Sequence, residues 1–406
     1  MRTLTRALLL FFGVIMYLLC NLSCSKAEAQ ALAEERSIAP EVKYRKYTLN
    51  SPPGQVTLHM ILIDSDALKE GRICLEPIMA RETVGGSSSP EAIAKKVGGI
   101  AAINGPYFAS AGGRVYPLGF TVIDGIIAQL GNENRPIVGI DSSGELKIQV
   151  AHPQAFVTSD AYFDPIFLWG INTPAGEENV TLYDRRWGTN ITLRDGIGVT
   201  ILPYKPESTS TIIVGPSGRV QDDWDGLIVS KQTSSPIEIP HDGWVLVFRG
   251  RSIPSAERYQ VGNKVSFYIY ELPSRWEKMR WIVTLGPWFV HEGNPRDYST
   301  ETRYSGNITG RAPRTVIGNT WNGEIFLAVT TGAPLNITET ANILTECNVR
   351  EAVMCDSGSS SGMWVNGIGT IGNNTAVPMA FVVRGIDAPL PQTKPLRVWQ
   401  GRLHRH

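Results

Sequence analysis

Short apolar segments separated by turn residues run through most of the chain, and this pattern constrains the fold more than any other feature. Gly, Pro, Asn and Asp separate the segments, and 40 glycines and 26 prolines in 406 residues fit that density of turns. We interpret these segments as β-strands. They are VTLHMILI from Val56, RICLEPI from Arg72, GIAAI from Gly99, GFTVI from Gly119, LKIQV from Leu146, GWVLVF from Gly243 and KVSFYIY from Lys264.

Two helices are predicted among these strands. Ser89 is a good cap for a helix that begins at Pro90 and stops at Gly98. A second helix is expected from about Thr338 to Cys347, where apolar residues recur at i, i+3 spacing. Each helix precedes a strand that ends near a polar residue. The predicted fold is therefore α+β, a large mixed β-sheet core with few helices and a site on loops at strand ends.

The N-terminus predicts export. Two early arginines precede the apolar run Ala7 to Cys20, and small residues follow. We interpret residues 1–29 as a signal peptide cut after Ala29. The alternative is a lipoprotein signal that anchors the chain through Cys24. The apolar run is too short and too early for a membrane span, so the expected location is secreted, periplasmic or at the cell surface.

The rest of the chain is expected to form one domain over residues 42–385, followed by a loosely attached tail over residues 386–406. The length also allows two smaller domains. Lysine plus arginine and aspartate plus glutamate both total 38, and this balance argues against a nucleic-acid binder.

The cysteines outside the signal peptide are Cys74, Cys347 and Cys355. Cys347 and Cys355 are the favoured disulfide pair in an exported chain, and buried thiols are an equal alternative. Their spacing fits no zinc motif, so no metal site is predicted and the cofactor remains open.

Three polar residues stand beside apolar runs in a way that favours a functional site. Asp356 follows the run AVMC and precedes five small residues that leave room for a ligand near the backbone. Arg314 lies between Pro313 and an apolar run, and a fixed guanidinium binds phosphate with two parallel hydrogen bonds. Asn104 ends another apolar run. The alternatives are a turn for Asp356 and Asn104 and a surface ion pair for Arg314.

Other patterns carry less weight. The run from Gly358 to Gly362 matches G-x-S-x-G, but a nucleophile elbow needs a helix after its serine, whereas MWVNG is typical of a strand and a turn. Asp124 and the glycine after it predict a hairpin turn. His291 and Glu292 also indicate a turn, and both are kept as secondary candidates for a second acid or base.

Taken in order, these segments resemble the phosphodiester glycosidase family, the domain shared by the mammalian uncovering enzyme of mannose 6-phosphate tagging and many exported bacterial proteins. The similar segments are IAAINGPYF with GFTVIDGII, FLWGINTP with TLYDRRWGTN, VTLGPWFVHEG, RAPRTVIG and AVMCDSGSSSG, and they extend from about Val42 to Arg384. The resemblance implies an exported α+β domain that hydrolyses a sugar-1-phosphodiester, with a glycan or sugar phosphate as its partner.

The resemblance also implies a site. The catalytic candidates are Asp356, Arg314 and Asn104; the substrate-binding candidates are Thr315, Gly358, Ser359, Ser360 and Ser361, with Glu292 as the secondary one. Three positions depart from the family's pattern: Thr331 replaces an acid, Met354 replaces an asparagine and Ser357 replaces a glycine. A non-catalytic glycan-binding or envelope-assembly protein is therefore the alternative, and ten tryptophans offer it material for stacking on sugars.

Overall fold

The computed structural model describes residues 32–385 except 163, 194, 205–224, 274, 277, 278 and 303. The predicted signal peptide, Cys24 and the tail over residues 386–406 lie outside the described residues. In the described part of the chain, no helix has the length and apolar character needed to cross a membrane. The prediction of one domain over residues 42–385 stays a prediction.

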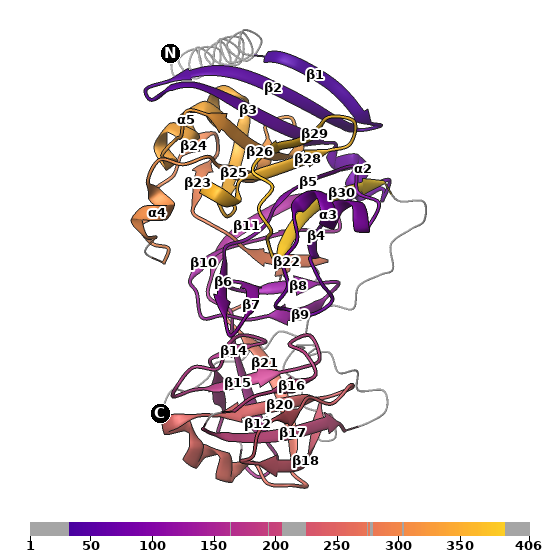
Figure 1. The fold of residues 1–406 in the computed structure, drawn as a ribbon, viewed down its shortest axis with the longest axis vertical. Helices are drawn as coiled ribbons and strands as arrows, with labels where there is room; N and C mark the ends of the chain where they lie inside the picture. Colours follow the sequence, from indigo (N-terminus) through magenta and orange to yellow (C-terminus); the bar gives the residue numbers. More distant parts are fainter. Residues whose placement is uncertain are drawn as a thin grey trace, which may run out of the picture.

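Strands dominate the structure, and the first large sheet lies at one end of the elongated molecule (Figure 1). Its eight strands follow the order β1-β2-β3-β26-β25-β27-β23-β24. Their bounds are β1 Leu32–Ala39, β2 Val42–Ser51, β3 Gly54–Ile63, β26 Ile325–Gly332, β25 Thr315–Thr320, β27 Val349–Met354, β23 Trp288–His291 and β24 Asn294–Pro295. Strands from both ends of the chain thus meet in one sheet.

Two five-stranded sheets pack beside it. One has the order β29 (Gly369–Gly372), β28 (Gly362–Val365), β5 (Ala101–Asn104), β30 (Met379–Gly385) and β4 (Ile73–Met79). The other has the order β11 (Leu146–Ala151), β10 (Arg135–Ile140), β22 (Trp281–Thr284), β8 (Thr121–Ile123) and β9 (Ile126–Gln129). The predicted turn after β8 is confirmed, because Asp124 and Gly125 have φ of 50° and 73°, as a tight hairpin needs.

A second eight-stranded sheet forms the other end of the molecule (Figure 1). Its order is β13 (Ile166–Leu168), β12 (Gln154–Ser159), β21 (Lys264–Tyr270), β18 (Gly226–Gln232), β17 (Ile197–Pro203), β20 (Trp244–Phe248), β15 (Val180–Tyr183) and β14 (Gly170–Ile171). Two small pairs complete the strands: β6 (Phe108–Ala111) with β7 (Arg114–Pro117), and β16 (Asn190–Ile191) with β19 (Ile237–Glu238).

The β-rich character is as predicted, but the strands do not form one large mixed sheet. They divide among several sheets, and the pairings of the described strands are antiparallel except for β14 with β15. Antiparallel strands can be joined by short turns, which explains why a chain so rich in turn residues forms several sheets of this kind.

Helices are few, as predicted. They are α2 (Ser65–Lys69), α3 (Pro90–Lys96), α4 (Gly306–Thr309) and α5 (Ile337–Glu346), with 3₁₀ segments η1 (Gly250–Arg258) and η3 (Gly358–Ser360). Both predicted helices are confirmed. The Ser89 hydroxyl accepts a hydrogen bond from the N–H of Ala92 at 3.2 Å, and Asn336 with Glu339 forms a capping box at the start of α5.

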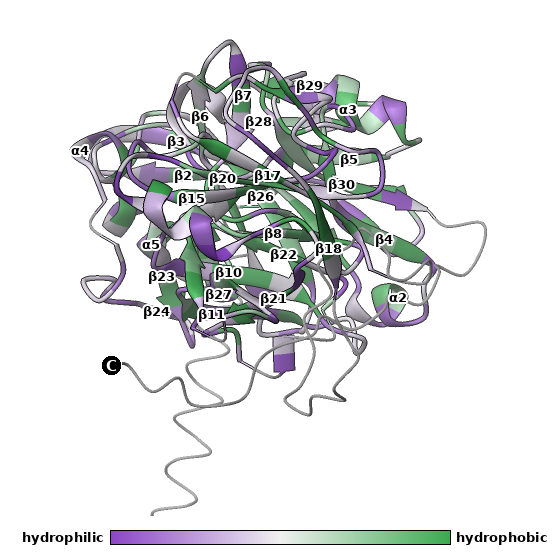
Figure 2. Ribbon diagram, turned by 90° about the horizontal axis from the view of Figure 1, so that it is seen from below, coloured by the Kyte–Doolittle hydropathy of each residue, from purple (hydrophilic) through white to green (hydrophobic). Residues whose placement is uncertain are grey.

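Apolar clusters fill the spaces between these layers. One lies between the first eight-stranded sheet and the two five-stranded sheets, and includes Ile61, Ile103 and Val283. Another lies between the β10–β22 sheet and the second eight-stranded sheet, and includes Ile137 and Leu246. Figure 2 shows the hydrophobic strands stacked in the interior, with hydrophilic segments on helices and outer loops. Strands such as β27 thus bury both of their faces, with Val353 in one cluster and Met354 in another.

The favoured Cys347–Cys355 disulfide is not present. Both side chains are buried, but Cys355 packs in the cluster between the sheets, whereas Cys347 packs with α5 on the opposite face of the first sheet. Residues on opposite faces of a sheet cannot be bridged without moving the backbone. Burial raises the pKa of the Cys355 thiol well above its usual value.

Candidate functional site

The fully buried side chain of Asn104, at the end of β5, contacts two other predicted site residues, Asp356 and Thr315. Its Nδ2 donates to the carbonyl oxygen of Asp356 at 2.7 Å. Its Oδ1 accepts from the Thr315 hydroxyl at 2.7 Å and from the N–H of Gly362 at 3.1 Å. One amide therefore ties β5 to β25, to the start of β28 and to the turn after β27. A buried amide with both ends satisfied is well suited to fix strand ends relative to one another.

Asp356 lies two residues beyond the end of β27, and its backbone is fixed. Its N–H donates to Gly105 at 3.0 Å, and its carboxylate accepts from the N–H of Ser357 at 3.0 Å and from the Ser360 side chain. Burial raises the pKa of Asp356, and these hydrogen bonds offset only part of that rise. Carboxyl groups with pKa values shifted in this way cluster at functional sites.

The turn after Asp356 packs against the segment before β25. Gly358 has φ of +74°, a conformation that favours glycine, and its N–H donates to Pro313 at 2.9 Å. The Ser361 hydroxyl donates to the same carbonyl at 3.0 Å, and Ser360 is buried while Ser359 is exposed. A strand follows the turn, so the run is not a nucleophile elbow.

Arg314 is held differently from the prediction. Its guanidinium is fully buried, and Nε and Nη1 donate to the carbonyls of Leu335 and Ile308 at 2.8 Å each. Nη2 donates to Gly310, and Nη1 also contacts the sulfur of Met354 at 3.4 Å. These acceptors occupy most of its five donors. Arg314 therefore fixes the loops around α4 and α5, and a phosphate would have to displace those carbonyls.

Arg314 and Thr315 are neighbours in sequence, yet they serve different sides of the first sheet. Thr315 bonds to Asn104 on the side of the five-stranded sheet, whereas Arg314 lies with Leu335 and Met354 on the side of α5. Successive side chains of an extended segment alternate in direction, which explains why these two side chains point to different faces of the sheet.

Glu292 does not join the other candidates. It lies in the turn after β23, and its carboxylate accepts from Arg350 at 3.2 Å near the start of β27. Asp356 follows the other end of that strand, six residues away, which corresponds to about 20 Å of extended chain. Its predicted substrate contact is therefore not compatible with a site at Asp356.

His291, Glu292 and Glu351 bring three ligand atoms within 4.8 Å of one another. Both acids are already engaged, because Glu292 pairs with Arg350 and Glu351 accepts from the Trp288 indole at 2.9 Å. These pairs account for the grouping without an ion.

The sequence interpretation missed Tyr107, which lies within electrostatic reach of Asp356, and Arg135, which contacts Tyr107. Tyr107 is buried, and its hydroxyl makes no hydrogen bond within the described part of the chain. Burial first and the charge of Asp356 second raise the pKa of Tyr107, whereas Arg135 and Arg314 oppose the rise. Tyr107 therefore lies within electrostatic reach of all three charged groups.

Arg135, the first residue of β10, lies over the rings of Tyr107 and Tyr304 at 5.2 and 5.1 Å. Its Nε is 3.0 Å from Glu133, but neither atom makes an aligned hydrogen bond within the described residues. The segment NRPIVGI sets an arginine beside a proline and an apolar run, as RAPRTVIG does, so this signal was available in the sequence.

The three departures from the family's pattern are all accommodated. Thr331 contacts His59 Nε2 at 3.0 Å, and burial lowers the pKa of His59 to about 4. Ser357 accepts from the N–H of Thr315 at 3.3 Å, and Met354 contacts Arg314. Each replacement thus has its own partner in this chain.

Residues 218–384 match the family model described as phosphodiester glycosidase, so the resemblance to that family is confirmed over this part of the chain. The match includes the segments VTLGPWFVHEG, RAPRTVIG and AVMCDSGSSSG, whereas IAAINGPYF precedes it. Comparison with curated protein sequences finds no match.

Among solved structures, the chain is similar to a hypothetical protein from Synechocystis, with a TM-score of 0.70 and 19% identity. The similarity covers 86% of this chain and 63% of the Synechocystis chain, which is less than two thirds of that protein's length. A putative exported protein from Burkholderia pseudomallei gives a TM-score of 0.62 and 16% identity, covering 81% of this chain and 74% of that one. The zebrafish N-acetylglucosamine-1-phosphodiester alpha-N-acetylglucosaminidase catalytic domain, auto-inhibited by its pro-peptide, gives 0.44 and 14% over 87% of each chain. The first two show a shared fold.

Proposed function

We propose that this chain is an exported hydrolase that cleaves a sugar-1-phosphodiester. The observation that carries the proposal is the placement of Asp356, which lies in the family-matched region on a backbone fixed by Asn104 and has a carboxyl pKa raised by burial. A raised pKa suits a group that exchanges a proton near neutral pH. The predicted signal peptide supports export.

In the proposed reaction, water adds across the bond between the anomeric carbon and the phosphate oxygen. That carbon–oxygen bond breaks, the water oxygen becomes the sugar hydroxyl, and the phosphate leaves as a monoester with the remaining proton. Asp356 acts at the anomeric carbon as a base, a nucleophile or a stabiliser of the oxocarbenium ion. The reaction needs no oxidant or reductant.

The phosphate needs a positive or donating partner, and Tyr107 lies within electrostatic reach of Asp356. We assign this role to Arg135, whose Nε lacks an aligned hydrogen bond, together with the Tyr107 hydroxyl. Burial keeps Tyr107 protonated, so its hydroxyl remains a donor. Arg314 is assigned a positioning role, and the turn from Gly358 to Ser361 is the proposed boundary of the substrate site.

The test is an assay of the mature chain against a panel of sugar-1-phosphodiesters, with and without a chelator. The expected result is release of the free reducing sugar together with a phosphomonoester. Release of a sugar 1-phosphate instead would show that the other phosphate bond breaks, which would contradict the role given to Asp356. Loss of product with chelator would add a metal to the site.

A second candidate, a glycan-binding protein without activity, is favoured by one observation. Thr331 stands where the family has an acid, and its contact with the buried, neutral His59 supplies no negative charge. Calorimetry with the same phosphodiesters, followed by product analysis of the solution in the calorimeter, separates the two candidates. Heat of binding without any product supports the second and contradicts the first.

A further inference from the structure

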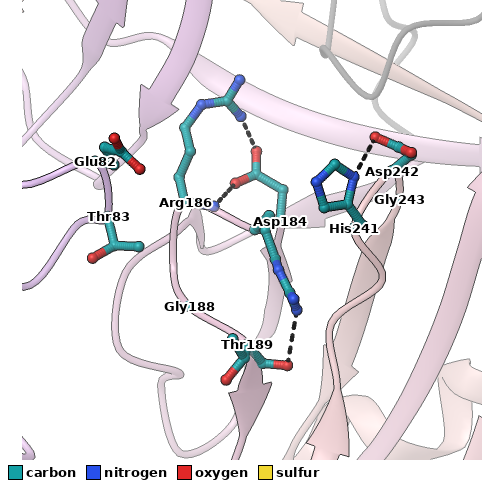
Figure 3. A pocket seen from close by; sticks show the side chains of 10 residues that line it. Glu82, Thr83, Asp184, Arg186, Gly188, Thr189, His241, Asp242 and Gly243 are labelled. Atoms are coloured by element: carbon teal, nitrogen blue, oxygen red, sulfur yellow. Dashed lines mark hydrogen bonds and ion pairs between the residues drawn. The ribbon is translucent and has the colours of Figure 1, made fainter.

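A polar cavity of about 480 Å³, whose lining residues do not include Asp356, lies where the loop after β4 meets the second eight-stranded sheet. Three segments line it: residues 82–83, residues 184–189 after β15, and residues 241–243 before β20 (Figure 3). A cavity of this size is in the range of small-molecule sites. Asn104, Arg314 and Asp356 are not among its lining residues.

The walls of the cavity are tied to one another by hydrogen bonds. The N–H of Val84 donates to the carbonyl of Arg186 at 2.7 Å, which joins the first segment to the second. Arg185 donates to the carbonyl of Ile239 at 2.8 Å, and the N–H of Ile239 donates to Thr189 at 2.9 Å, which joins the second segment to the third. The cavity is therefore preformed, and a ligand would not have to order its walls.

A buried carboxylate lies at the centre of the lining residues. Asp184 has a side chain only 5% exposed and accepts from Asn172 Nδ2 at 2.9 Å and from the N–H of Arg186 at 2.8 Å. Its second oxygen pairs with the Arg186 guanidinium (Figure 3). Since Asp184 is already neutralised and hydrogen-bonded, it does not require a bound cation.

The remaining charges are also balanced. At the outer edge His241 contacts Asp242 at 2.9 Å, and both side chains are mostly exposed. Glu82 stands opposite the Asp184–Arg186 pair (Figure 3). A phosphate entering the cavity would meet three carboxylates, and a metal ion would meet two guanidinium groups. A neutral ligand bearing hydroxyl groups avoids both penalties, because each hydroxyl donates to a carboxylate or accepts from a guanidinium.

We propose that this cavity binds a neutral saccharide unit, at a site separate from Asp356. Glu82 and Thr189 contribute acceptors and Arg186 contributes donors to the sugar hydroxyls. This inference does not depend on hydrolysis, since none of these residues takes part in the proposed reaction. The site would hold the chain on a glycan whether or not a phosphodiester is cleaved.

The experiment is titration calorimetry on the mature chain with N-acetylglucosamine, N,N′-diacetylchitobiose and maltose as neutral probes, and with inorganic phosphate and Ca²⁺ as charged probes. At least one neutral sugar is expected to bind more tightly than either ion. T189W fills the cavity from an exposed position and is expected to weaken that binding at least tenfold. E82A removes one acceptor and should weaken it about 3- to 10-fold.

E346W is the matched control, because Glu346 is an exposed residue of α5 that does not line the cavity. It should bind the sugar as the unaltered chain does. The inference is overturned if none of the three sugars binds, if the ions bind instead, or if T189W and E82A bind as tightly as E346W. A thermal melt of each variant separates lost binding from lost folding. Failure of the hydrolysis assay leaves these outcomes unaffected.

Discussion

Arg314 and Arg135 come from similar sequence contexts, yet the structure uses their guanidinium groups in different ways. Each lies near a proline and opens an apolar strand segment. Arg314 donates to the backbone carbonyls of Leu335, Ile308 and Gly310. Arg135 lies over two tyrosine rings and forms an ion pair with Glu133 at 3.0 Å, in which the two facing atoms do not make an aligned hydrogen bond.

The difference teaches which buried cation is available to a ligand. A guanidinium whose donors are satisfied by carbonyls stabilises the fold, and moving it would leave those carbonyls unpaired. A guanidinium held by ring faces is positioned without consuming its donors. The two arginines share a similar sequence context, but Arg314 is fully buried whereas the Arg135 side chain is 11% exposed, and their partners differ. The partners therefore decide the role.

The largest effect should come from Asp356, the proposed catalytic carboxylate. Asp356→Asn removes the charge but keeps the shape, and turnover of a sugar-1-phosphodiester should fall by about 10³-fold or more if the acid does chemistry. The measurement is kcat of Asp356→Asn. A melting temperature at or above that of the unaltered chain shows that the variant is folded. Turnover within tenfold of the unaltered chain would remove Asp356 from the mechanism.

Arg314→Met should act on stability. The change strands three buried carbonyls, and the expected loss is about 3–5 kcal/mol in the free energy of unfolding. Urea unfolding measures it, with Arg311→Met as the control, because Arg311 makes an exposed ion pair with Glu339. A loss of stability no larger than that of the control, combined with weaker substrate binding, would support the sequence prediction that Arg314 binds the phosphate.

Arg135→Gln should act on the substrate. Loss of one charge-assisted contact to phosphate should raise KM about 10- to 100-fold, equivalent to about 1.5–3 kcal/mol. The melting temperature should change much less than in Arg314→Met. An unchanged KM in a folded variant would contradict the role assigned to Arg135 and would indicate that this residue has a structural role only.

The smallest effect concerns pH and stability. Burial raises the pKa of Asp356, so the folded chain binds its proton more tightly than the unfolded chain does. This carboxyl therefore favours folding at low pH, and that contribution is lost as the pH rises from the ordinary carboxyl pKa through the raised one. Asp356→Asn should melt higher than the unaltered chain at pH 7, and the gap should close towards pH 3. A gap that widens on acidification would contradict the raised pKa of the Asp356 carboxyl.

Local features of this structure could be read from the sequence. The strand segments, the helices capped by Ser89 and Asn336, and the turn at Asp124 all depend on residues close together in the chain. The positions of Asn104 and Asp356 at strand ends followed from the same local patterns.

The contacts between distant segments could not be read in this way. Asn104 reaches Asp356 across 252 positions, and nothing near either residue specifies that partner. Glu292 is a secondary candidate in the sequence because the cleavage needs a second acid or base, but strand pairing puts it beside Arg350 at the other end of β27.

The sequence by itself determined where strands, turns and two helices form, since hydrophobic alternation and capping act over a few residues. The tertiary structure alone decided that the strands divide among several sheets, that Arg314 faces the loops around α4 and α5, and that three distant loops enclose the cavity around Asp184. The physical reason is that a side chain's role depends on which groups satisfy its charge and hydrogen bonds, and packing brings those groups together from far along the chain.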